Sequence, residues 1–211
     1  MKSQECIFLA LAIRLEPETM RRVRRVVAMG TGGLGRGNVT PVAEFNIWQD
    51  AEAAKIIVEF GFSELMFVGW DACLGESMLT AADIERIRSS GRLGAFAMDC
   101  NAQLLALNRE RFGEDCLDMA DPAAVAAALC PECIGNCSRY FCEVDISPGP
   151  GYGGFYVDVD GCLGRQPNAF VCSSLKADVY KEYVFQRLSE GAAKEMSGAA
   201  VVSGTIKRLG S

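Results

Sequence analysis

Residues 37–54 of this 211-residue chain read GNVTPVAEFNIWQDAEAA. Three polar side chains in this stretch, Asn38, Glu44 and Asn46, stand just before a segment in which apolar residues recur at helical spacing, from Asp50 to Phe60. Amide side chains both donate and accept hydrogen bonds and carboxylates accept them, which suits a ligand that presents several hydroxyl groups. The stretch therefore predicts a polar binding loop that leads into a helix.

Apolar patterns on both sides of this stretch alternate between helix and strand. Strands are expected over Val26–Met29, Leu65–Gly69 and Phe155–Val159. Helices are expected over Cys6 to about Arg25, Asp50–Phe60, about Leu93 to Phe112 with Phe96, Cys100, Leu104 and Leu107 on its apolar face, Ala123–Leu129, and about Ala177 to Leu188. This order predicts an α/β fold, a mostly parallel Rossmann-like sheet flanked by helices that binds ligands beyond the carboxyl ends of its strands.

Composition excludes several classes of function. The formal net charge is −6, whereas a sequence-independent nucleic-acid binder needs a basic face, so no nucleic-acid partner is expected. The apolar run over residues 6–13 is too short to span a bilayer, so no membrane association is expected either. Histidine is absent, which excludes Ser-His-Asp and Cys-His mechanisms.

The 37–54 stretch resembles the pattern G-N-x-T-P-x-A-E-F-N-x-x-x-D-x-E-A-A of inosine-uridine type nucleoside hydrolases. Residues 9–18, 68–71 and 156–159 are similar to the same family, and 120–126 (ADPAAVA) resemble its H-D-P-L-A-V-A. The resemblance covers about residues 9–190 and implies the C-terminal portion of that fold. It implies that residues 1–211 form a single partial, or incomplete, nucleoside hydrolase domain with a divergent Cys- and Gly-rich insertion at 130–155 and a tail at 191–211.

The resemblance also implies an activity and a ligand set. The family hydrolyses the N-glycosidic bond of ribonucleosides, in purine and pyrimidine salvage, by attack of a metal-activated water. By the match, Asn38 and Glu44 hold the ribose 5'-hydroxyl and Asn46 the 2'-hydroxyl. Asp121 matches an aspartate that binds calcium, a hard cation suited to carboxylate oxygens.

Three departures from the family pattern concern catalysis. Nothing in the sequence matches the family's D-T-D-x-G-x-D-D motif, residues 4–8 replace its G-P-L-T-N, and Ala120 stands where many members have a histidine. Asp121 alone supplies too few oxygens for tight calcium binding. No catalytic residue is therefore retained, and we expect the chain to be inactive alone. The alternative is a noncatalytic ribose-binding or interaction paralogue, as a homo-oligomer or paired with an intact hydrolase subunit.

Simpler structural roles remain open for the same residues. Asn38, Glu44 and Asn46 also fit a polar loop ahead of an ordinary capped helix, and Asp121 fits an N-cap of the helix that begins near Pro122. Asp71 is expected to order a strand end. A sheet without its first strands also exposes an apolar edge, so we expect the isolated chain to be marginally stable or to self-associate.

Ten cysteines are the remaining signal. Four of them, Cys130, Cys133, Cys137 and Cys142, form a C-x2-C-x3-C-x4-C run that allows a zinc or iron-sulfur site as a further alternative, although scattered thiols in an insertion are the favoured interpretation. In a structural zinc site two closely spaced pairs of ligands are usually separated by a longer loop. The four cysteines of this run have no such loop between them. Reduced thiols and a cytoplasmic location are expected, since the cysteines do not frame short loops.

Overall fold

The computed structural model describes residues 5–189, and these divide into two compact units. The first comprises residues 5–75 and 120–176, and the second comprises 76–119 and 177–189. The single domain expected over 1–211 stays a prediction, and the tail expected at 191–211 lies outside the described residues. Within those residues, no helix has the length and apolar character needed to cross a bilayer.

The first unit is built on a five-stranded sheet in the order β1-β2-β7-β5-β6. The strands are β1 Arg25–Met29, β2 Glu64–Val68, β5 Cys137–Val144, β6 Phe155–Asp158 and β7 Ala169–Cys172. Pairs β1·β2 and β2·β7 are parallel, whereas β5 is antiparallel to both of its neighbours, so four strands run one way and β5 the other. The expected α/β fold with a mostly parallel sheet is confirmed.

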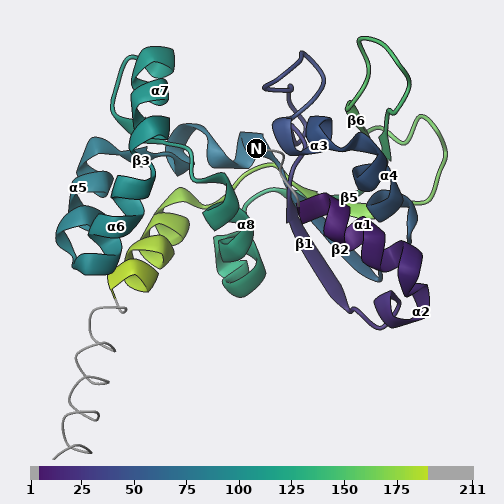
Figure 1. Cartoon of the computed structure of the whole chain (residues 1–211), viewed down its shortest axis with the longest axis horizontal. Helices are drawn as coiled ribbons and strands as arrows, with labels where there is room; N and C mark the ends of the chain where they lie inside the picture. The colour runs from purple at the N-terminus through teal and green to yellow at the C-terminus, as the bar shows by residue number, and fades with distance from the viewer. Residues whose placement is uncertain (1–4, 190–211) are drawn as a thin grey trace, which may run out of the picture. The chain divides into compact units, whose positions relative to one another are not determined.

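One face of this sheet is covered by α1 Glu5–Leu15, α3 Phe45–Gln49 and α4 Ala51–Glu59, and the short α2 Pro17–Met20 follows α1 (Figure 1). The core of the unit lies between them. Its buried members are Ile13, Ile47, Ala51, Ala54, Ile57, Val58, Phe62, Leu65, Phe67, Cys142, Val144, Phe155, Ala169 and Val171. Apolar side chains at alternate strand positions supply the sheet's part of this core, as a pleated strand requires.

The opposite face is covered by α8 Ala120–Leu129. Four alanines of this helix are buried, which lets its backbone approach the strands closely. The Arg25 guanidinium of β1 donates to the carbonyls of Ala127 (3.4 Å) and Ala128 (3.2 Å) at the end of α8. The short 3-10 helices η1 Trp70–Cys73 and η3 Pro131–Cys133 belong to the same unit.

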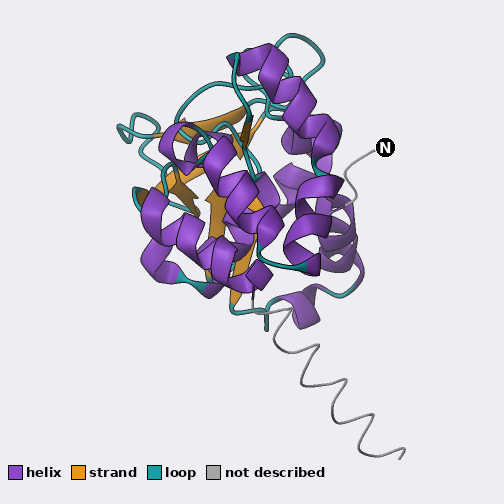
Figure 2. Cartoon of the chain, turned by 90° about the vertical axis from the view of Figure 1, so that its left-hand side faces the viewer, coloured by secondary structure: helices purple, strands orange, loops and turns teal. Residues whose placement is uncertain are grey.

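The second unit is mainly helical. It contains α5 Ala81–Ser89, α6 Arg92–Cys100, α7 Ala102–Phe112, a helical segment over residues 177–189, and a small antiparallel pair of β3 Leu79–Thr80 with β4 Cys116–Leu117 (Figure 2). The 3-10 turn η2 Gly75–Ser77 leads into it. The Thr80 hydroxyl and the Asp83 carboxylate cap the start of α5 reciprocally.

Two of the expected helices are wrong in extent. The opening helix ends at Leu15, and a new short helix starts at Pro17, because proline cannot donate the hydrogen bond that a continuous helix needs. The long helix expected over 93–112 is broken at Asn101, whose side chain donates to the Ala97 carbonyl (2.9 Å) and competes with the helical pattern. Its expected apolar face is not a core face, since Phe96 is 66% exposed.

Candidate functional site

Glu44 organises the start of α3. It is the N-cap of the helix, and its Oε2 accepts hydrogen bonds from the backbone N–H of Asn46 (3.0 Å) and Ile47 (3.4 Å). The residue is only 2% exposed. Burial raises the pKa of this carboxyl above its usual value, while the surrounding backbone N–H donors act in the opposite direction. The buried carboxylate therefore joins the start of α3 to the backbone that follows β1.

Asn38 belongs to the same structure. Its Oδ1 accepts a hydrogen bond from the Phe45 backbone N–H (2.8 Å), which ties the predicted loop to the first residue of α3. The loop between them is tight, because the Thr40 hydroxyl accepts from Ala43 N–H (3.0 Å). At Gly37 a Cβ atom would collide with the Thr40 and Ala43 carbonyls, so the backbone packs here in a way that only glycine allows.

Asn46 connects this loop to the sheet. Its Nδ2 donates to the sulfur of Met29 (2.9 Å), the last residue of β1. The three predicted polar residues, Asn38, Glu44 and Asn46, therefore gather around the start of α3 at the carboxyl end of β1. Ligands of α/β proteins bind at this end of the strands.

Thr31 is a residue of this region that sequence reasoning missed. It follows Gly30 after β1, has φ of 72°, and is 0% exposed. Its backbone N–H donates to Glu44, and within residues 5–189 its hydroxyl has no hydrogen-bond partner. A β-branched residue in the left-handed region is a rare conformation that tends to mark functional sites. The only sequence signal was its place in the glycine-rich run that begins at Gly30.

Asp121 lies on α8, which covers the face of the sheet opposite to α3. It is the second residue of α8 instead of the N-cap, and its side chain is exposed. Together with Met29 it lines a groove of about 350 Å³ that runs along β1 between α1 and α8. Met29 thus accepts a hydrogen bond from Asn46 and also lines the same groove as Asp121. No hydrogen bond between described residues joins Asp121 to Asn38, Glu44 or Asn46.

A calcium site does not fit the residues that the structure describes. Residues 5–189 hold no group of three or more His, Cys, Asp or Glu side chains placed to bind a metal ion. Calcium takes about six to eight oxygen ligands, and Asp121 can give at most two. We therefore derive no reaction step through a metal.

Asp71 holds the glycine-rich loop that leads to Asn38. Its Oδ2 accepts from Leu34 N–H (3.0 Å) and its Oδ1 from Ala72 N–H (2.9 Å). Gly33 has φ of 71° and leaves no room for a Cβ against this carboxylate. Burial raises the pKa of Asp71 to about 6, against the opposing effect of the two N–H donors.

The cysteine run does not form one cluster. Cys137 is in register with Cys172 on β7, whereas Cys142 belongs to the apolar core under α1 and α4. Successive residues of a strand point to opposite faces, so positions 137 and 142 of β5 are separated by the sheet. The four cysteines therefore cannot ligate a single metal ion, and the metal-binding alternative has no geometric support.

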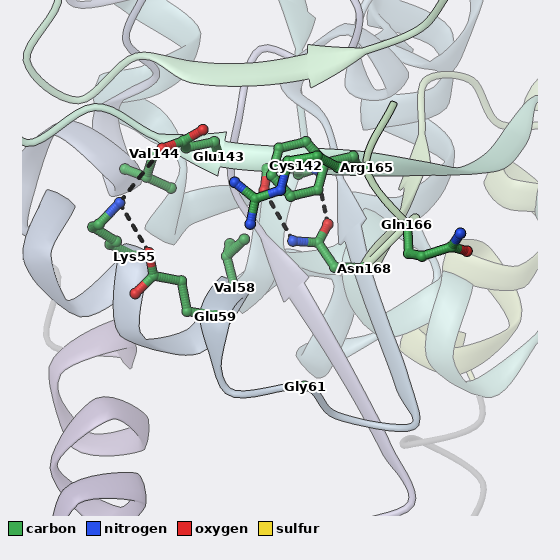
Figure 3. Close-up of a pocket in the computed structure, with 11 residues that line it drawn as sticks. Lys55, Val58, Glu59, Gly61, Cys142, Glu143, Val144, Arg165, Gln166 and Asn168 are labelled. Carbon is green, nitrogen blue, oxygen red and sulfur yellow. Dashed lines mark hydrogen bonds and ion pairs between the residues drawn. The ribbon is translucent and has the colours of Figure 1, made fainter. Parts of the chain in front are cut away.

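A second hollow, of about 440 Å³, lies beside α4 and β5 and contains none of the predicted site residues (Figure 3). Lys55 reaches Glu59 (3.0 Å) and Glu143 (3.8 Å) across it. Asn168 uses its side-chain oxygen and nitrogen to bind the backbone of Cys142. Lys55 and Asn168 are thus engaged in contacts within the protein, while the exposed Arg165 and Gln166 also line the hollow.

Comparison with known proteins identifies the family. The model of the inosine-uridine preferring nucleoside hydrolase family matches residues 8–182. A protein of Shigella boydii named putative pyrimidine-specific ribonucleoside hydrolase RihB is 32% identical over 171 residues, which are 81% of this chain and 69% of that protein. The Escherichia coli protein named pyrimidine-specific ribonucleoside hydrolase RihB is also 32% identical over 81% of this chain and 53% of its own length.

Solved structures show the same fold. A plant nucleoside hydrolase superposes with a TM-score of 0.78 at 23% identity, over 87% of this chain and 59% of that one. A purine-preferring ribonucleoside hydrolase from Gardnerella vaginalis gives a TM-score of 0.77 at 24% identity, over 88% and 58%. The chain thus spans between about half and two thirds of the length of the relatives it matches. It belongs to the inosine-uridine preferring nucleoside hydrolase family.

Proposed function

We propose that this chain carries the ribose-binding part of an enzyme that hydrolyses the N-glycosidic bond of ribonucleosides. The observation that supports the proposal most directly is the gathering of Asn38, Glu44 and Asn46 at the carboxyl end of β1. The relatives' names, pyrimidine-specific and purine-preferring ribonucleoside hydrolase, agree on ribonucleosides and differ on the base. The proposed ligand is accordingly a ribonucleoside, recognised through its sugar.

The hydrogen-bonding capacity of the two asparagine side chains supports these roles. Asn38 already uses its carbonyl oxygen on Phe45 N–H, which leaves its NH₂ group to donate to a hydroxyl. The Glu44 carboxylate already accepts from backbone N–H groups around it, so its proposed role at the 5'-hydroxyl rests on the family resemblance. Asn46 donates to a thioether sulfur, a weak acceptor, so exchanging that contact for the ribose 2'-hydroxyl costs little.

Turnover is a separate matter from binding. Hydrolysis needs an activated water and stabilisation of an oxocarbenium-like transition state. The described residues bring no cluster of carboxylates together, and the sequence contains no histidine. We propose that residues 5–189 bind ribose without hydrolysing nucleosides, and that Asp121 occupies the position of a calcium ligand of the family. The cytoplasmic location and a role in nucleoside salvage stay predictions.

A noncatalytic binding or interaction module is the second candidate, and the edge of the sheet favours it. Among the described strands β1 pairs only with β2, so its other edge presents unpaired backbone groups. The groove beside that edge is lined by Val26, Val27, Ala28 and Met29 in succession. An added strand can bind such an edge through main-chain hydrogen bonds. A second copy of the chain or an intact hydrolase subunit is the proposed partner.

The two candidates are separated by measuring binding and turnover on the same preparation. Titration calorimetry with inosine and uridine should show binding, and a ribose-release assay with calcium should show no enzymatic turnover. Asn46→Ala should weaken binding, whereas Gln166→Ala, an exposed residue of the second hollow, should not. Absence of saturable nucleoside binding by the folded chain would refute the ribose site, and enzymatic ribose release by this chain would refute its proposed inactivity.

A further inference from the structure

Cysteines distant in the sequence meet on the α8 face of the sheet. Cys137 of β5 and Cys172 of β7 are directly opposite each other in the antiparallel pair, although 35 positions separate them in the chain. Val68 is the parallel neighbour of Cys172 on β2, and the positive charge of Arg25, which contacts α8 on this face, acts on Cys137 electrostatically. The sequence run groups Cys137 with Cys130, Cys133 and Cys142, whereas in the sheet the residue opposite Cys137 is Cys172.

The register brings the two sulfurs close together. One step along the ladder, Ser173 N–H donates to the Asn136 carbonyl (2.9 Å), so residues 136 and 173 form a hydrogen-bonded pair. Hydrogen-bonded and non-hydrogen-bonded pairs alternate in antiparallel sheets, and side chains of the second kind lie closer. Cys137 and Cys172 are therefore a non-hydrogen-bonded pair. The two thiols are neighbours, and the Cys172 Sγ donates to the Ser174 carbonyl (3.4 Å). The Cβ spacing of such a cross-strand pair, about 4.5–5.5 Å, lies near the range that a disulfide requires.

The surroundings make the two thiols unequal. The neighbouring Cys172 thiol and, to a lesser degree, the positive charge of Arg25 lower the pKa of Cys137 despite its partial burial. The neighbouring Cys137 and burial raise the pKa of Cys172, which is 0% exposed. Thiolates are the attacking species in thiol–disulfide exchange. Cys137, half-buried, is accordingly the thiol that meets a reagent, and Cys172 is its internal partner.

We propose that Cys137 and Cys172 form a reversible disulfide across β5 and β7, with a low-molecular-weight disulfide as oxidant. The Cys137 thiolate attacks one sulfur of the oxidant, whose S–S bond breaks and whose other half leaves as a thiolate. Cys172 then loses its proton and attacks the Cys137 sulfur, which releases the second half. Two protein thiols are oxidised, one small disulfide is reduced to two thiols, and the protons pass to those thiols.

A disulfide between the neighbouring cysteines Cys130 and Cys133 is the competing outcome. Cys130 and Cys133 follow α8 at η3, and their thiols are also neighbours. Burial and the neighbouring Cys130 raise the pKa of Cys133 to about 11, which makes it a poor nucleophile. Cys142 lies on the opposite face of the sheet among apolar side chains. Cys142→Ser is therefore the matched control for Cys137→Ser, since both change one cysteine of β5.

The test uses the full reduced chain treated with oxidised glutathione, then acid-quenched, alkylated and mapped by mass spectrometry without reduction. We expect two of the ten thiols to escape alkylation and one cross-linked peptide pair to contain Cys137 and Cys172. Cys172→Ser should stop at one glutathione on Cys137, Cys137→Ser should give no cross-link to Cys172, and Cys142→Ser should behave as the unchanged chain. Circular dichroism checks that each variant is folded.

Two results would overturn the proposal. One is a cross-link joining Cys130 to Cys133 while Cys137 and Cys172 remain alkylated. The other is full alkylation of Cys137 and Cys172 after an oxidant exposure that modifies an exposed thiol such as Cys100. Because the unchanged chain decides between these results by itself, the conclusion does not depend on whether the cysteine variants fold.

Discussion

Two regions of the first unit differ in how they affect stability: the apolar face of the sheet under α1 and α4, and the carboxyl end of β1. The face buries Leu65, Phe67 and Val171 among aliphatic side chains, and every such contact favours folding. The carboxyl end buries the Glu44 carboxylate and holds Thr31 at a positive φ, both of which cost free energy. The comparison indicates that stability resides in one region and ligand recognition in the other, so substitutions should separate the two.

The largest loss of stability is expected from the apolar face. Phe67 is 1% exposed and packs edge-on against Phe155 with ring centroids 4.8 Å apart. Phe67→Ala should lower the free energy of unfolding by about 3–5 kcal/mol, because it removes apolar contacts and leaves a cavity. Urea unfolding followed by tryptophan fluorescence measures the change. Phe96→Ala, at a 66% exposed position, is the control, and an equal loss there would contradict the assignment of the core.

An intermediate effect is expected at the helix caps, where Glu44 can be compared with Asp50. Glu44 caps α3, and Asp50 caps α4 by accepting from Ala53 N–H (2.9 Å). Either residue replaced by alanine should cost about 1 kcal/mol of stability, the usual value of an N-cap. Only Glu44→Ala should also weaken nucleoside binding in calorimetry. If both variants bound nucleosides as the unchanged chain does, Glu44 would be a cap and nothing more.

A pH-dependent effect is expected from Asp71. Its folded pKa of about 6 lies above the ordinary 3.8, so the folded state favours the protonated form. Its contribution to stability is therefore fully present below the ordinary pKa and is lost as pH rises through the folded one. Asp71→Asn, which stays neutral, should gain stability relative to the unchanged chain between roughly pH 4 and pH 7. Urea midpoints across this range test it, and a constant difference would show that the pKa is not raised.

The sequence predicted most accurately those parts that depend on neighbours in the chain. Strands β1 and β2 contain the continuous apolar runs that predicted them, Val26–Met29 and Leu65–Val68. Asn38 and Glu44 contact the start of α3 within a few residues of themselves. Local patterns of this kind are visible without knowing the rest of the fold.

Features that depend on distant partners were not predicted. Strand β7 has four residues, and β5 lies inside the segment that departs from the family pattern, so neither shows a strand period of its own. The contact of Asn46 with Met29 joins residues 17 positions apart, and the pairing of Cys137 with Cys172 depends on the order of the strands. The register of a sheet is set by packing between elements, and a single sequence does not reveal it.

The smallest change in stability, with a clear change in binding, is expected from Asn46. Its side-chain contact is to a sulfur acceptor, so Asn46→Ala should alter the free energy of unfolding by less than about 0.5 kcal/mol. Loss of one hydrogen bond to ribose should weaken nucleoside binding by up to about tenfold. Calorimetry with inosine and uridine should show the same loss for both, because the sugar is common to them. A loss confined to one nucleoside would place Asn46 against the base instead of the ribose.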